Sequence, residues 1–125
     1  MAEALARSYG SDVMIASSAG LTPASFTVPE TRSVLMERNI ALGDHLPRRL
    51  SDVDLSEIDV VVNMSGRKLP EVSNPQVRVE NWPVTDPIGL SSDVFRTVRD
   101  DIEMRVMNLI LRMRTGKFDL SATTP

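Results

Sequence analysis

The sequence predicts one α/β domain, a three-layer fold in which helices flank a parallel sheet. Short apolar segments at residues 13–16 and 58–64 alternate along the chain with segments of helical periodicity, the pattern of strands joined by helical crossovers. The length of 125 residues, with 42% hydrophobic and 25% charged residues, fits a single globular domain that folds without disulfides or metals. Ligands of such folds bind beyond the carboxyl ends of the strands.

The first half of the chain is predicted to hold one strand between two helices. Residues 1–9 are rich in alanine and other good helix formers, so we expect a helix there. Residues 13–16, Val-Met-Ile-Ala, are expected to form a buried strand that leads into a loop of small residues at 17–20. Pro29 and Glu30 suit the first turn of a second helix, predicted over residues 29–39.

The second half is predicted to hold two strands and a long helix. Residues 58–64 are β-branched and almost continuously apolar, as in a strand covered on both faces, whereas residues 77–82 alternate like a strand nearer an edge. Ser91 or Ser92 can cap a helix that runs to residue 114, with apolar residues at steps of three and four: Val94, Val98, Ile102, Val106, Leu109, Ile110 and Met113. The domain is therefore expected to span residues 1–114, and residues 115–125 to form a polar, flexible tail.

The composition excludes several classes of protein. There is no cysteine, so disulfides, thiolate metal sites and a cysteine nucleophile are absent from this chain. A net charge of −3 gives no general attraction to nucleic acid or to an anionic membrane. No apolar run resembles a spanning helix or a signal peptide, so we expect a cytoplasmic protein. Zinc spacing and glycine-rich nucleotide motifs are also missing, and we expect neither metal nor cofactor.

The candidate functional residues follow the predicted strands. The loops at 17–20, 64–66 and 82–89 should share one rim of the sheet, and the last of them carries Asp86 before Pro87. An Asp-Pro pair is by itself most often a turn. The single His45 is by itself more often a structural or surface residue than a functional one.

Several short motifs occur in a fixed order, and together they are more specific than any one alone. They are Met1-Ala2-Glu3-Ala4, Ser18-Ala19-Gly20, the single His45, the buried strand ending at Met64, Trp82-Pro83-Val84-Thr85-Asp86-Pro87 and the long C-terminal helix. In order and spacing, residues 1–114 resemble the low-molecular-weight protein tyrosine phosphatase and arsenate reductase family.

The resemblance implies a reaction at a phosphate-binding loop of the form Cys-x5-Arg, which family members carry between a central first strand and the first helix. Its thiolate attacks phosphorus or arsenic, helix N-terminal amides and the arginine hold the oxyanion, and an aspartate protonates the leaving group. Asp86 matches that general acid. Ser18 and His45 match positions that support the loop through hydrogen bonds.

The resemblance also implies that the chain is truncated at its N-terminus. In relatives the loop is followed by Ser-Pro-Met-Ala-Glu or Ser-Gln-Met-Ala-Glu, and Met1-Ala2-Glu3 matches the end of that string. We therefore expect the first strand, the cysteine and the arginine to be missing, and the chain as given to be inactive. Ser65 stands near a further redox cysteine of thioredoxin-linked arsenate reductases, which disfavours that relay but not reductases that use the loop cysteine alone.

Two functional hypotheses remain open. In the first, the chain is a truncated hydrolase or reductase of a phosphate- or arsenate-like oxyanion; phosphatase is slightly preferred, because no second cysteine supports a reductase relay. In the second, it is a non-catalytic descendant that binds an anion or a protein. Loss of a central strand would leave two sheet edges open. We therefore expect re-paired strands, or a homodimer or strand swap that closes the sheet.

Overall fold

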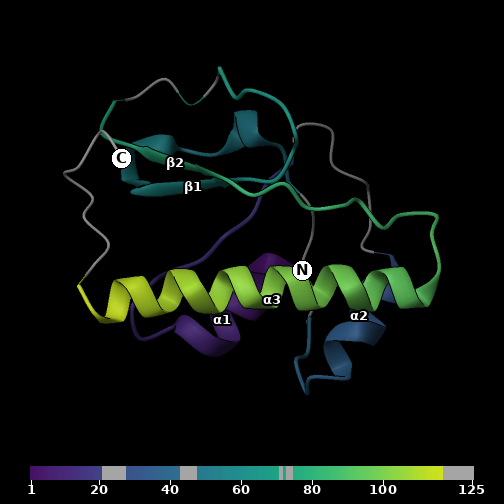
Figure 1. Cartoon of the computed structure of the whole chain (residues 1–125). Helices are drawn as coiled ribbons and strands as arrows, with labels where there is room; N and C mark the ends of the chain where they lie inside the picture. Colours follow the sequence, from purple (N-terminus) through teal and green to yellow (C-terminus); the bar gives the residue numbers. More distant parts are fainter. Residues whose placement is uncertain (21–27, 43–47, 71, 73–74, 117–125) are drawn as a thin grey trace.

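The computed structural model describes residues 1–20, 28–42, 48–70, 72 and 75–116 (Figure 1). The elements in chain order are α1 (Ala2–Gly10), α2 (Pro29–Met36), the 3-10 turns η1 (Leu50–Asp52) and η2 (Leu55–Glu57), β1 (Val60–Asn63), β2 (Arg78–Asn81) and α3 (Ser92–Arg114). The α-helices lie on one side of the strands in Figure 1, and the 3-10 turns on the other. The predicted α/β fold with a parallel sheet flanked by helices is confirmed.

The sheet consists of β1 and β2, which pair in parallel with Val60 opposite Arg78 and Asn63 opposite Asn81. The ladder continues one residue beyond each end of this register. The backbone N–H of Arg78 donates to the Asp59 carbonyl over 3.0 Å, and that of Trp82 donates to the Asn63 carbonyl over 2.9 Å. Both predicted strands are therefore present, each somewhat shorter than its apolar segment.

The predicted strand at residues 13–16 is wrong. Its first residues form the turn that ends α1, since the N–H groups of Val13 and Met14 both donate to the Gly10 carbonyl over 3.0 Å. Within the described residues, the segment pairs with no strand, and the Ile15 side chain is fully exposed. Strand propensity reflects packing against neighbouring strands, so this apolar run stays irregular where no neighbour is present.

The long helix α3 supplies half of the buried core cluster, on the face that its periodicity predicted. The Ser91 hydroxyl caps it by accepting from the Val94 N–H over 3.4 Å. The buried side chains from α3 pack with Leu5 of α1, Leu35 of α2 and Trp82 after β2; those from the predicted set are Val98, Ile102, Val106, Leu109 and Ile110. Phe95 and Arg99 are also buried, and the apolar periodicity did not include them.

The second helix ends at Met36 rather than at Asn39. Asn39 adopts a left-handed conformation with φ of 59°, and the N–H of Ile40 donates back to the Leu35 carbonyl over 3.1 Å. This arrangement satisfies the last carbonyls of a helix and reverses the chain. Asn39 therefore ends the helical region, as the sequence predicted, although the last residue of the α-helix itself is Met36, three residues earlier.

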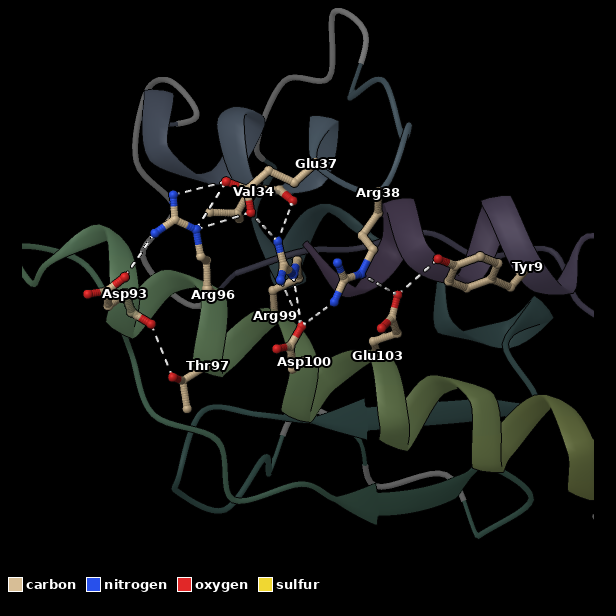
Figure 2. A network of polar contacts seen from close by, with 10 residues as sticks. All are labelled: Tyr9, Val34, Glu37, Arg38, Asp93, Arg96, Thr97, Arg99, Asp100 and Glu103. Carbon is tan, nitrogen blue, oxygen red and sulfur yellow. Dashed lines mark hydrogen bonds and ion pairs between the residues drawn. The ribbon is translucent and has the colours of Figure 1, made fainter.

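A polar network fastens α2 to α3 (Figure 2). The guanidinium of Arg99 is nearly buried and donates to the Val34 carbonyl over 3.0 Å and to the Glu37 carboxylate over 2.5 Å. Arg96 also donates to Glu37, over 3.0 and 3.1 Å. Hydrogen bonds from these two arginines lower the pKa of Glu37. The orientation of α2 is thus set by charged contacts as well as by its two buried apolar residues.

Candidate functional site

The first turn of α1 is the centre of the candidate site. No side-chain hydrogen bond caps this helix at Met1, and a helix N-terminus favours negative charge. Burial lowers the pKa of the Met1 amine, although the Glu3 carboxylate opposes the shift. Glu3 itself is nearly covered, with its side chain 9% exposed, and it forms an ion pair with Arg7 over 3.0 Å.

Ser18 is attached to this turn. Its hydroxyl donates to Glu3 Oε1 over 2.5 Å, while Arg7, on the next turn, donates through Nε to the Ala16 carbonyl over 3.0 Å. The predicted supporting residue therefore contacts the start of α1 through Glu3. Sequence reasoning used Glu3 only as part of a motif; its spacing of four residues from Arg7 on a helix was the available signal for the ion pair.

A second attachment holds the loop that contains Ser18. Arg48 donates through Nε to the Ser18 carbonyl over 3.0 Å, and Gly20 forms a parallel bridge with Arg49. A pocket of about 330 Å³ lies beside this loop, lined by the first two turns of α1, by Ser18 and by residues 39–42. His45, the other predicted supporting residue, lies outside the described residues.

Asp86 lies in a turn on the surface. Its Oδ1 accepts from the Ile88 N–H over 3.1 Å, and the Leu90 N–H donates to the Pro87 carbonyl over 2.9 Å. The Asp-Pro pair thus starts a turn, as the dipeptide alone suggests. The Asp86 side chain is exposed to solvent, where a ligand could reach it. Asp86 does not line the pocket beside Ser18, so among the described contacts the predicted acid and the predicted support are not joined.

The carboxyl ends of β1 and β2 are tied together by two asparagines. The buried amide of Asn63 donates to Asn81 Oδ1 over 3.0 Å and to the Arg67 carbonyl over 2.7 Å. Its own oxygen accepts from the N–H of Ser65 over 3.0 Å and from the hydroxyl of Ser65 over 2.6 Å. The predicted rim loops at residues 64–66 and 82–89 therefore start at one shared edge of the sheet. The hydroxyl of Ser65 is held in place at this edge by its hydrogen bond to Asn63.

The loop that carries Asp86 starts from a second polar cluster. Glu80 accepts from Trp82 Nε1 over 3.0 Å and from two nitrogens of Arg112 over 2.5 and 3.2 Å. Burial alone would raise the pKa of Glu80, but the hydrogen bonds from Arg112 and Trp82 outweigh it and the pKa is lowered. Because Trp82 is also part of the core, this cluster fixes the point where the loop leaves the sheet.

The described residues place no three metal-ligating side chains together. None of their helices is long and apolar enough to cross a membrane. The polar groups near the first turn of α1 and at the strand ends are thus hydroxyls, amides, a buried carboxylate and arginines. Such groups can position an anion and transfer a proton, but they include no strong nucleophile.

Residues 1–117 match the sequence profile of a family described as low molecular weight phosphotyrosine protein phosphatase. A glutaredoxin arsenate reductase of Synechocystis is 31% identical over 115 residues, which cover 90% of this chain and 87% of the relative. A protein of Halobacterium salinarum with a provisional arsenate reductase name is 34% identical over 90 residues, covering 72% of this chain. The matched part is 63% of that relative's length, below two thirds.

Solved structures of arsenate reductases share the fold. One in the reduced state superposes with a TM-score of 0.79 at 31% identity, covering 89% of this chain and 86% of the other. Another, described as being in the phosphate binding state, superposes with a TM-score of 0.77 at 28% identity, covering 90% and 86%.

Proposed function

Because the chain belongs to the low molecular weight phosphotyrosine protein phosphatase family, we propose that it forms part of a site for a tetrahedral oxyanion, either a phosphate ester or arsenate. The observation that carries the proposal is the family match over residues 1–117, supported by the hydrogen bond that holds Ser18 against Glu3 in the first turn of α1. A structural neighbour in a phosphate binding state supports an oxyanion as the ligand.

The proposed chemistry needs a thiolate that residues 1–125 do not contain. In the family reaction with a phosphate ester, a sulfur–phosphorus bond forms while the phosphorus–oxygen bond to the leaving group breaks. Asp86 would deliver the proton that the leaving oxygen takes up, and water would then release phosphate from sulfur. We therefore propose that the 125-residue chain alone turns over no substrate and that Asp86 becomes an acid only when a thiolate is supplied.

Arsenate is the second candidate substrate, and the arsenate reductase names of the relatives favour it. Reducing arsenate to arsenite takes two electrons, which thiols supply by becoming a disulfide. Ser65 stands near the position at which thioredoxin-linked arsenate reductases carry a further redox cysteine, which disfavours an internal relay. An external thiol would have to be the reductant, in keeping with the glutaredoxin in the name of the Synechocystis relative.

The test joins a strand and Cys-x5-Arg loop from that relative to Met1 and compares the fusion with the 125-residue chain. We expect no hydrolysis of an aryl phosphate and no arsenate-dependent thiol oxidation by the chain, and measurable turnover of one substrate by the fusion. The Asp86→Asn fusion should lose about 10²–10⁴-fold in kcat. Asp52→Asn, at another exposed aspartate, is the matched control and should lose nothing.

Three results would contradict the proposal. Turnover by the 125-residue chain that survives rigorous purification and Asp86→Ala would show that the thiolate is not required. Full activity of the Asp86→Asn fusion would remove Asp86 from the chemistry. A folded fusion that binds phosphate without turnover would favour the alternative, a non-catalytic anion- or protein-binding descendant.

A further inference from the structure

The outward face of α3 carries apolar side chains that no part of the described chain covers. One side of the helix packs against α1, α2 and the strands, whereas Met104, Met107 and Leu111 on the opposite side are 66%, 41% and 58% exposed. Their spacing of three and four residues places them in one row along the helix. Scattered apolar residues are ordinary on a protein surface, but a contiguous row indicates an interaction site.

A charged residue stands at each end of this row. An acid, Asp100, precedes it and a base, Arg114, follows it. The steps of four, three, four and three residues that result are those of the seam along which two helices pack in a coiled coil. We call these positions the α3 seam, and they are Asp100, Met104, Met107, Leu111 and Arg114.

Both end residues keep one polar atom that makes no hydrogen bond among the described residues. Asp100 accepts from Arg38 and Arg99 through Oδ1, over 2.9 Å in each case, which leaves Oδ2 (Figure 2). Arg114 uses Nε and Nη2 for its bonds to Asp12 and to a backbone carbonyl, which leaves Nη1. Both side chains are about half exposed, so each can take a further partner of opposite charge from another molecule.

The seam is complementary to a second copy of itself that runs in the opposite direction. Positions 100 and 114 lie equally far from Met107, so a two-fold axis there brings Asp100 of each copy beside the partner's Arg114. The same operation lays Met104 against the partner's Leu111 and the two Met107 side chains against each other. A parallel copy would instead oppose acid to acid and base to base, which costs affinity.

We propose that the chain forms a homodimer in which the α3 seams of two copies pack antiparallel about a two-fold axis at Met107. Methionine and arginine, which the seam contains, are enriched in protein interfaces. The seam has far fewer residues than the roughly 20–30 a side of a standard interface, so the association is weak and reversible. The proposal does not depend on the oxyanion function, and the contact differs from a homodimer that closes the sheet, because it uses no strand.

The absence of cysteine from the chain allows a direct test by cross-linking. Met107→Cys places two thiols at the two-fold axis, so mild oxidation should give a disulfide-linked dimer. Thr97→Cys is the matched control, because position 97 is exposed on the same helix but lies about 30 Å from its counterpart in the antiparallel pair. This control should therefore remain largely monomeric. In a parallel pair it would cross-link as readily as Met107→Cys.

Sedimentation of the unmodified chain tests the dimer without cross-linking, and the average mass should rise with protein concentration. Met107→Glu puts two carboxylates at the axis and should weaken the dimer by about tenfold or more. Ile88→Glu, at an exposed apolar residue outside α3, should leave the association unchanged. Helical circular dichroism shows whether each variant is folded.

Three results would overturn the proposal. A chain that is still monomeric at about 1 mM would exclude a second copy and leave the seam to a helix of another protein. Equal cross-linking of the two cysteine variants would exclude the antiparallel arrangement. A dimer that is as stable with Met107→Glu as without it would place the contact on another surface of the molecule. None of these readouts depends on oxyanion binding.

Discussion

Replacing Glu80 by glutamine tests how strongly the polar cluster on β2 holds the start of the loop that carries Asp86. Glutamine keeps the size of the side chain and one acceptor, but it removes the charge that Arg112 and Trp82 bind. The Arg112 guanidinium would then remain partly buried beside a neutral amide. We expect the variant to be less stable than the parent chain at neutral pH.

The magnitude follows from the exposure of the two charged partners. The side chains of Glu80 and Arg112 are 19% and 30% exposed, so the pair is neither buried nor fully solvated. Hydrogen bonds to charged groups contribute roughly 1.5–3 kcal/mol and exposed ion pairs about 0–1 kcal/mol. We expect a loss of about 2 kcal/mol in the free energy of unfolding, in the lower half of the first range, because both side chains keep some exposure. With roughly 2.1 cal/mol/K of unfolding entropy per residue, Tm should fall by about 8 °C.

The pH dependence of the free energy of unfolding provides a second, independent test of the Glu80 cluster. The folded chain holds the pKa of Glu80 below its unfolded value, so ionised Glu80 stabilises the fold above the unfolded pKa of about 4.3. This contribution disappears as the pH falls from there through the folded pKa. The difference between the parent and Glu80→Gln should therefore be constant from pH 6 to 8 and shrink below pH 4.

Urea unfolding can be followed by the fluorescence of Trp82, the only tryptophan, and by helical circular dichroism. Glu57→Gln, at an exposed glutamate in η2, is the control and should change stability little. A cycle with Arg112→Met should give a coupling energy of about 1–2 kcal/mol. A Glu80→Gln chain within about 0.3 kcal/mol of the parent at pH 7, or an unchanged pH profile, would refute the reasoning.

Two further substitutions probe the packing of α3. Gly10→Ala would normally favour a helix by about 1 kcal/mol, but its new Cβ would lie 2.7 Å from Cγ1 of the buried Ile110. Chemical unfolding should therefore show a net loss of stability. A gain in stability would refute the predicted clash. Arg99→Met should cost about 3 kcal/mol because it removes the buried donor to the Val34 carbonyl and one of the two arginines that bind Glu37. A neutral result in the same assay would mean that water replaces the guanidinium.

The parts of the fold that were predictable are those that local pattern determines. Helix α3 buries one face over six turns, so its periodicity of three and four residues identified both its length and most of its core positions. Residues 13–16 have an equally apolar sequence, yet they form no strand. The difference is that a helix satisfies its own backbone, whereas a strand depends on a neighbour that local sequence does not specify.

The site was predictable only in part. Resemblance to a family indicated Ser18 and Asp86, and the structure gives them partners in Glu3 and the Ile88 N–H. Those partners depend on how α1 and two loops meet in space, which spacing along the chain does not reveal. Arg99 was missed for another reason: a charged residue on a helix is usually exposed, and only its contacts with α2 explain its burial.

The arginines that α3 extends to α2 also bear on how the molecule opens. An isolated helix of eight residues is not stable in water, and α2 buries only Val34 and Leu35, so it exists as a helix mainly while it is docked. Its contacts through Arg96 and Glu37 are partly exposed and are screened by salt. Local unfolding of α2 should therefore become more frequent as ionic strength rises, while α3 stays folded.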